Sequence, residues 1–281
     1  MGKKKRKAKS PYTMMIEIMG IILIAYSFLT IIFKDKTIEE KPQEEKIELV
    51  PYADYDFNKL SIFGNMSYED DNYTSMFGID VAAHQETIDW KKVKEAGVEF
   101  AYIRLGYRGA TEGVLHTDLE FENNYKGAIE NGIKVGIYWY SQPINEKEAY
   151  AEARYVINEL NGRHIDLPIA YDFEETYFSD GTISRMHDMS KQDRTNMALT
   201  FCEELNRNGY DTIIYTNLDW IRNYYDMDKL KKYPIWLALY SNTPSNDYPF
   251  IMWQYTDTGT IDGIDHFVDL DIMFIRKNDQ N

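Results

Sequence analysis

The spacing of apolar and polar positions divides the chain into an irregular first part and a regular second part. From Phe77 onward, short apolar runs alternate with segments whose apolar residues have helical spacing. Helices are expected at 89–95, 118–130, 146–160 and 191–208, with at most a short one at 220–225, and each long segment ends near a glycine. Runs typical of buried strands lie at 77–82, 99–106, 134–141, 167–174, 211–217, 234–240, 250–256 and 268–274.

The order of these elements predicts the fold class. Repeated strand–helix units with almost continuous apolar strands indicate an α/β fold whose parallel sheet is buried on both faces. Eight such strands favour a TIM-like (β/α) barrel with an incomplete ring of about five helices, because helices become scarce after the fifth strand. A doubly wound open sheet is the alternative, but no Gly-x-Gly-x-x-Gly follows the first strand, so a dinucleotide site has little support.

The part before Phe77 predicts a tail, an anchor and a linker. Residues 1–13 hold six Lys and Arg and no acid, and 14–33 form an apolar run long enough to cross a bilayer as a single transmembrane helix. The basic tail places the amino terminus in the cytoplasm and residues 77–281 outside the cell membrane. A signal peptide is the rival, but its apolar part is usually ~7–15 residues long and ends in a small-x-small site. Residues 34–76 are expected to be an acidic linker.

Charge and cysteine content narrow the possible partners. The formal net charge is −15, and without the six positive charges of residues 1–13 it becomes −21. The rest of the chain is therefore acidic enough to repel nucleic acid, which is not expected as a partner. The single cysteine, Cys202, excludes an intramolecular disulfide. The five histidines show no His-x-x-x-His spacing, so neither a metal nor another cofactor is expected.

Candidate catalytic residues lie at the ends of the predicted strands, where such a barrel has its active site. Asp172 and Glu174 are two apart on one strand, so both side chains point to one side and their Cα atoms are roughly 6.5–7 Å apart. Two carboxyls this close share a proton unevenly, as a general acid and an anion do at a glycosidic bond. Asp80 on the first strand and Asp269 on the eighth add two acids.

Arginine, amide and aromatic residues accompany these acids at the strand ends. Each has an ordinary structural explanation alone, but together with the acids they suit a sugar-binding groove, because aromatic faces stack on pyranose rings. The candidate substrate-binding residues are Arg104, Tyr107, Tyr138, Tyr140, Tyr215, Asn217, Tyr240, Trp253 and Gln254.

Sequence blocks across this region resemble glycoside hydrolase family 25, the Chalaropsis-type lysozymes or N-acetylmuramidases. They are GIDVAAHQETIDW (78–90), FAYIRLGYRG (100–109), GIYWYS (136–141), LPIAYDFE (167–174), IYTN (214–217), PIWLALY (234–240) and MWQYT…GIDHFVDLD (252–271). The resemblance implies a flattened barrel and cleavage of the β-1,4 bond between N-acetylmuramic acid and N-acetylglucosamine in peptidoglycan. Where the family commonly has Gln-Gly, this chain has Gln85-Glu86, so we expect a different turn there.

The resemblance also implies roles for single residues. Glu174 matches the general acid and Asp172 its partner carboxylate, while Asp80 and Asp269 match further acids. The matched positions in the saccharide groove are Arg104, Tyr138, Trp253 and Gln254. Spacing leaves the stereochemistry open, because such a pair can reach either the ~5–5.5 Å of retaining enzymes or the ~6.5–9.5 Å of inverting ones. A substrate-assisted retaining route is preferred, and water attack with Asp80 or Asp269 as base is the runner-up.

These observations predict a membrane-anchored peptidoglycan hydrolase whose partner is the glycan strand. Two other functions are compatible with the sequence. One is a wall-binding protein that keeps the groove without turnover, and the other is an assembly role with partners in an envelope complex. The presence of all four acids argues against a loss of activity.

Overall fold

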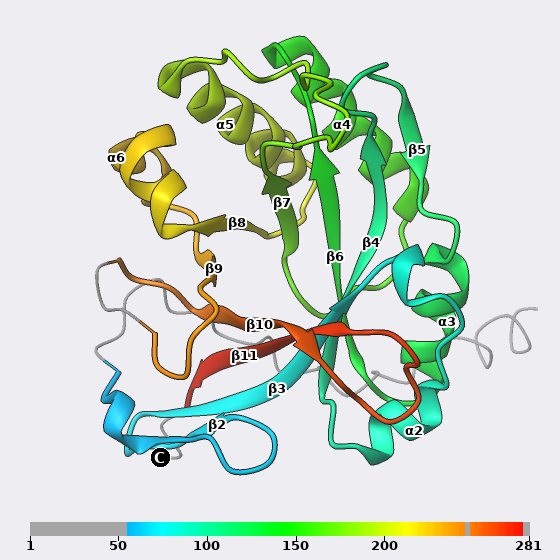
Figure 1. The fold of residues 1–281 in the computed structure, drawn as a ribbon, viewed down its shortest axis with the longest axis vertical. Coiled ribbons are helices and arrows are strands. Elements are labelled where there is room, and N and C mark those ends of the chain that lie inside the picture. The colour runs from blue at the N-terminus through cyan, green and yellow to red at the C-terminus, as the bar shows by residue number, and fades with distance from the viewer. Residues whose placement is uncertain (1–54, 245–247, 278–281) are drawn as a thin grey trace, which may run out of the picture. The chain divides into compact units, whose positions relative to one another are not determined.

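The structure, a computed structural model, describes residues 55–244 and 248–277. Eight strands close into a barrel (Figure 1), and the ring closes where the first strand pairs with both the second and the last. In ring order the strands are β3 (Tyr73–Val81), β4 (Phe100–Arg108), β6 (Lys134–Ser141), β7 (Ile169–Phe173), β8 (Thr212–Asn217), β9 (Ile235–Ala238), β10 (Met252–Gly259) and β11 (Val268–Arg276). A short strand, β5 (Leu115–Thr117), extends β4 outside the ring.

One strand of the ring runs against the others. The strands from β3 to β10 pair in parallel around the ring, whereas β11 is antiparallel to both β10 and β3. Only residues 260–267 join β10 to β11, and a parallel return would need a crossover of a dozen or more residues. The reversal brings the first residues of β11 to the end of the barrel where the other strands finish. We call this end the acidic rim because Asp269 lies there beside Asp80.

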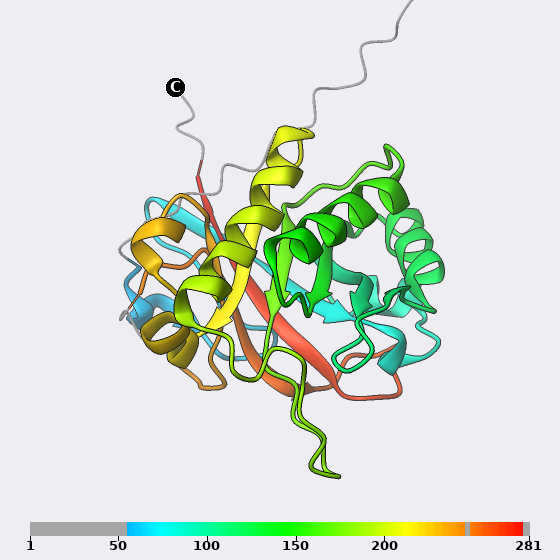
Figure 2. The ribbon, with the colours of Figure 1, turned by 90° about the horizontal axis from the view of Figure 1, so that it is seen from above.

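Helices cover only part of the barrel. The principal ones are α2 (Trp90–Glu95), α3 (Phe121–Glu130), α4 (Glu146–Leu160) and α5 (Lys191–Arg207), and a π-helical turn η3 (Trp220–Tyr224) and α6 (Met227–Leu230) follow β8. The helices α4 and α5 pack side by side over β6 and β7 (Figures 1 and 2). Their first turns are capped by Asn145 and Ser190, whose side chains accept hydrogen bonds from backbone N–H groups.

Alternation along the strands sends side chains to two apolar regions. Outward-facing residues such as Ile79 and Trp139 belong to the large core that the helices cover. Inward-facing residues form a smaller cluster inside the barrel, which includes Tyr102, Tyr138 and Trp236. Inside the barrel, these packed aromatic rings lie beneath the polar groups of the acidic rim.

These findings correct the expected fold class. The strands and helices lie close to the predicted positions, but the fold is a closed eight-stranded β-barrel with few helices and not a TIM-like (β/α) barrel. The expectation failed because β11 is antiparallel and because, in the described residues, no helix longer than η3 follows β8. A TIM barrel needs eight parallel strands, each followed by a helix.

The expectations for the first 76 residues meet the structure only in part. The basic tail 1–13 and the membrane-spanning helix expected at 14–33 lie outside the described residues. Within 55–244 and 248–277, no helix is both long and apolar enough to cross a membrane. The second half of the expected linker is folded, since it contains η1 (Phe57–Lys59), β1 (Leu60–Ser61), β2 (Ser67–Tyr68) and the start of β3. Tyr55 stacks on Phe274 of β11 with ring centroids 4.2 Å apart.

Candidate active site

Two carboxyl groups stand at the carboxyl end of β7. Asp172 is buried, and it pairs with Tyr140 of β6 on one side and Tyr215 of β8 on the other. Glu174 follows the last residue of β7 and is partly exposed. The strand pattern places both side chains on the inner face of the barrel, at the acidic rim.

Burial raises the pKa of both carboxyl groups. For Asp172 the negative charge of Glu174 raises the pKa further, and a hydrogen bond between the two adds to this. The same hydrogen bond lowers the pKa of Glu174, and the guanidinium of Arg104 lowers that of Asp172. Two charges cannot be held this close away from water, so the pair retains one proton between them.

A second group of acids spans the pair of strands β3 and β11. Asp269 lies opposite Asp80 in the ladder, and Asp271 lies deeper in the barrel. Burial raises the pKa of all three, to about 6 for Asp269 and well above the usual range for Asp80 and Asp271. The indole of Trp236 donates a hydrogen bond of 2.8 Å to Asp271. Among the described residues, no group of three or more His, Cys, Asp or Glu side chains is arranged to hold a metal ion.

Gln254 of β10 connects the second group of acids to the aromatic residues of the rim. Its amide nitrogen donates to Oδ2 of Asp80 at 2.8 Å. Its amide oxygen accepts from the hydroxyls of Tyr215 at 2.8 Å and Tyr240 at 3.1 Å. These three bonds fix the orientation of the amide, and they leave Tyr240, which is largely exposed, at the edge of the site.

Arg104 of β4 brings a positive charge to the rim. Its Nε and one Nη each bind Oδ2 of Asp118 at 2.7 Å, and its guanidinium lies 5.4 Å from the ring centroid of Tyr107. The ladder between β4 and β6 is irregular at Leu105, and this irregularity places Tyr107 opposite Tyr140. The arginine is therefore held rigidly on the same inner face as the carboxyl pair.

The structure brings most of the predicted residues together but excludes Trp253 from the rim. Trp253 is fully buried in the outer core, and its indole donates to the carbonyl of Leu239 at 2.7 Å. Asn217 ends β8 two residues after Tyr215 and so lies on the same face, where its side chain accepts from the backbone N–H of Trp220 at 3.0 Å and shapes the turn into η3. The residues that do meet on the inner face are Asp80, Arg104, Tyr107, Tyr138, Tyr140, Asp172, Tyr215, Gln254 and Asp269, with Glu174, Asn217 and Tyr240 at its edge.

Three residues of the site are not among the predicted site residues. Asp271 was within reach of sequence reasoning, because it alternates with Asp269 on one strand and so shares its face. Asp118 begins a segment with the spacing Asp-x-x-Phe-x-x-Asn (118–124), but nothing in that spacing indicates a partner 14 residues earlier in the chain. In the sequence, Trp236 looks like an ordinary strand residue. It comes into contact with Asp271 because the strands close into a barrel.

The family model and two of the relatives that this chain matches concern lysozymes or their glycosyl hydrolase family. Residues 79–264 match the family model of the glycosyl hydrolases family 25. The chain is 30% identical over 197 residues to the autolytic lysozyme of Clostridium acetobutylicum. The aligned region covers 70% of this chain and 55% of that protein. It is 31% identical over 202 residues to lysozyme M1 of Streptomyces globisporus, covering 68% of this chain and 65% of the relative.

Solved structures are similar over the same region. The modular autolysin LytC of Streptococcus pneumoniae, in complex with a synthetic peptidoglycan ligand, superposes with a TM-score of 0.62 at 25% identity, covering 70% of this chain and 46% of that one. A bacterial lysozyme from Streptomyces coelicolor superposes with a TM-score of 0.56 at 27% identity, covering 70% and 90%. This chain thus spans about half the length of the clostridial lysozyme and of LytC.

Proposed function

Because the chain belongs to glycosyl hydrolase family 25, we propose that it hydrolyses peptidoglycan at the β-1,4 bond between N-acetylmuramic acid and N-acetylglucosamine. One observation carries the proposal to this chain. Asp172 and Glu174 stand together at the carboxyl end of β7, burial raises the pKa of both, and they lie on the same face as an arginine and several tyrosines. Such a pair supplies both the acid and the anion that cleavage of a glycosidic bond requires.

In the proposed reaction Glu174 protonates the oxygen of the leaving sugar as the bond to the anomeric carbon breaks. The carbonyl oxygen of the substrate's own 2-acetamido group attacks that carbon, and Asp172 accepts a hydrogen bond from the acetamido N–H. Water then attacks the anomeric carbon and breaks its bond to the acetamido oxygen, and the proton that the water loses goes to Glu174. This division of roles is the one that the family resemblance implies. The positive charge of Arg104 works toward it by lowering the pKa of Asp172, against burial and the charge of Glu174, which raise that pKa by more.

Direct attack by water, with Asp80 or Asp269 as the base, remains the runner-up. The two routes differ in the configuration of the product, since the substrate-assisted route retains the anomeric configuration and direct attack inverts it. NMR of the first product formed on a short glycan distinguishes them. A retained product from the wild type, together with measurable turnover by Asp269→Asn, supports the route through the acetamido group.

The test of the proposed activity is the release of muropeptides from purified peptidoglycan by the full chain. Mass spectrometry after borohydride reduction identifies the new reducing ends, and Glu174→Gln and Asp172→Asn are the matched variants. We expect new ends on muramic acid, and a loss of activity of at least about 100-fold in Glu174→Gln, as is typical when a general acid is removed. New ends on glucosamine would overturn the assignment of the bond. No release from any of several wall types would favour a wall-binding protein.

The location of the chain is a separate part of the proposal and rests on the sequence of residues 1–33 alone. We place the catalytic domain on the outer side of the cell membrane, tethered by residues 14–33. The full chain should then sediment with membranes, while residues 34–281 should be recovered in the soluble fraction. Equal partition of the two would remove this part of the proposal and leave the activity untouched.

A further inference from the structure

Glu174 lies just beyond the part of β7 that the barrel holds in place. The last residue pairs of β7 join Phe173 to Ser141 of β6 and Asp172 to Tyr215 of β8. The carbonyl of Glu174 instead accepts a hydrogen bond of 2.6 Å from the side-chain amide of Gln142. The backbone position of this acid therefore depends on a side chain of the neighbouring segment.

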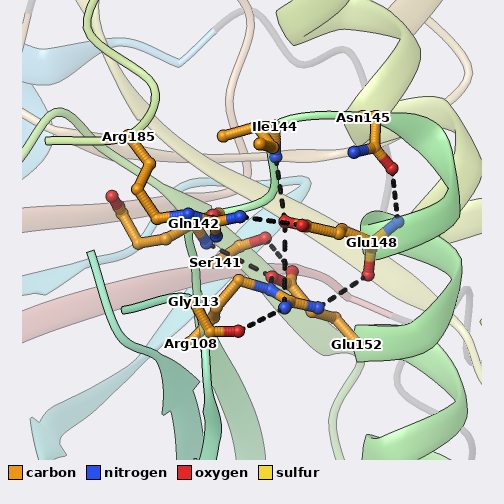
Figure 3. A network of polar contacts seen from close by, with 9 residues as sticks. All are labelled: Arg108, Gly113, Ser141, Gln142, Ile144, Asn145, Glu148, Glu152 and Arg185. Atoms are coloured by element: carbon orange, nitrogen blue, oxygen red, sulfur yellow. Dashed lines mark hydrogen bonds and ion pairs between the residues drawn. The ribbon is translucent and has the colours of Figure 1, made fainter. Parts of the chain in front are cut away.

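Gln142 is fully buried and is itself held by a buried ion pair (Figure 3). Its backbone N–H donates to Oε1 of Glu152 at 3.4 Å, and the hydroxyl of Ser141 donates to Oε2 of the same carboxylate. The Nε of Arg108 donates to Oε1 of Glu152 at 2.6 Å. Three donors, from β4, from β6 and from the residue that follows β6, thus converge on one carboxyl group of α4, which explains why a glutamate is tolerated inside the core.

The other nitrogens of Arg108 bind main-chain carbonyls and leave the guanidinium little freedom. One Nη donates to the carbonyl of Gly113 at 2.6 Å and the other to that of Glu148 at 3.1 Å (Figure 3). These bonds connect the end of β4, the loop that follows it and the first turns of α4. A planar guanidinium with five donors and fixed partners gives rigid support to the residues that pack against it.

A second arginine holds Gln142 from the segment that follows Glu174. Arg185, which lies between β7 and α5, donates to the carbonyl of Gln142 at 3.4 Å and to Oε1 of Glu148 at 2.7 Å. Its guanidinium lies close against Gly113, where a Cβ would approach one Nη to 2.5 Å. Gln142 is therefore fixed on one side by Arg108 and Glu152, and on the other by Arg185.

We propose that Gln142 is a positioning residue for Glu174, and that the network of Arg108, Glu152 and Arg185 keeps it in the position this requires. The inference rests on the proposed function, in which Glu174 is the general acid. Acid catalysis requires the carboxyl to stay within about 0.5 Å of its working position, and a residue beyond the end of a strand needs a support of its own for that. Gln142 touches no substrate in this scheme and acts only through Glu174.

The test compares Gln142→Met with the wild type in the full chain, on purified peptidoglycan fragments. Methionine keeps the length and the burial of the side chain but removes the donor to the carbonyl of Glu174. We expect kcat to fall by about 10- to 100-fold with KM within about twofold, since the acid works only in the transition state. The alkaline limb of the pH profile of kcat should also shift, because Glu174 moves relative to Asp172.

The matched control is Gln192→Met on α5, whose exposed side chain binds Asn196 at 2.6 Å, and it should keep the wild-type kcat.

The outcomes separate this inference from the proposed function. An inactive wild type would remove the proposed function itself. An active wild type with unchanged kcat and pH profile in Gln142→Met would overturn the positioning role, whatever the melting temperature of the variant. If Gln142→Met does not fold, Arg185→Met replaces it as the test of the positioning role. The side chain of Arg185 is partly exposed, so this variant is expected to fold. It should lower kcat by about 3- to 10-fold, and an unchanged kcat there would overturn the proposal.

Discussion

Asp269 shows how a single carboxyl group at the acidic rim makes folding depend on pH. Burial, followed by the charges of Asp257 and Glu174, raises its pKa to about 6, although a hydrogen bond from Asp80 lowers it. In the unfolded chain an aspartate has a pKa of about 3.9. Between these values the native state binds more protons than the unfolded state, so the free energy of unfolding falls as the pH rises from about 4 to 6 and stays reduced above that window.

We therefore expect Asp269→Asn to stabilise the protein at pH 7.5, by about 1–3 kcal/mol, and to have a smaller effect at pH 4. Urea unfolding at the two pH values measures the difference. The exposed Asp188 provides the matched control, since Asp188→Asn should change stability little at either pH. An equal effect of Asp269→Asn at both pH values would mean that the burial of its charge is not what limits stability.

Glu152 is a second single residue with a large expected effect, in this case because its charge is paired. Burial raises its pKa to about 7 while Arg108 lowers it. Replacing it by Gln leaves the buried Arg108 only the longer ion pair of 3.8 Å with Glu148, which should cost up to about 3–5 kcal/mol in urea unfolding at pH 8. The double variant Arg108→Met with Glu152→Met should lose less than Glu152→Gln alone, because it leaves no unpaired charge. A double variant less stable than Glu152→Gln would contradict this account.

At the scale of elements, the sequence predicts what local spacing controls. The helix α4 runs over 146–160 as expected, because its start has an Asn cap and its end has Asn161 followed by Gly162. The direction of β11 could not be predicted from its own residues, since an alternating pattern is the same in both directions. The short connection 260–267 was the available signal. The outward direction of Trp253 was within reach of the sequence, because a neighbour of Gln254 on a strand points to the opposite face.

The turn after β3 holds a non-glycine residue in a conformation that favours glycine. Glu86 has φ 55° and ψ −133°, and its side chain forms an exposed ion pair of 3.5 Å with His266. Glu86→Gly should therefore raise the free energy of unfolding by about 1 kcal/mol, as relief of backbone strain outweighs the loss of a weak surface pair. Glu86→Ala is the matched control, because it keeps the strain and removes the pair. If Glu86→Ala stabilised as much as Glu86→Gly, the carboxylate and not the backbone would be the cause.

At the scale of the whole molecule, the charge of the chain opposes its proposed substrate in the native wall. The formal net charge is −15. A wall that carries anionic polymers repels such a protein, and this repulsion is long-range, with a Debye length of ~10 Å at 0.1 M salt. The proposed chemistry takes place at Asp172, which is buried, and at Glu174, which is only partly exposed, and salt screens such groups less than exposed ones. Salt should therefore act on the approach to the wall and not on bond cleavage.

The expected outcome is that turnover on intact walls rises by about 2- to 10-fold between 20 and 200 mM salt, as it does when like charges slow an encounter. Peptidoglycan from which the anionic polymers have been stripped is the control, and turnover on it should change little over the same range. The comparison separates the two effects, because the scissile bond is the same in both substrates. A rise on both would place the effect of salt in the active site, and a fall on intact walls would show that the acidic surface does not oppose binding.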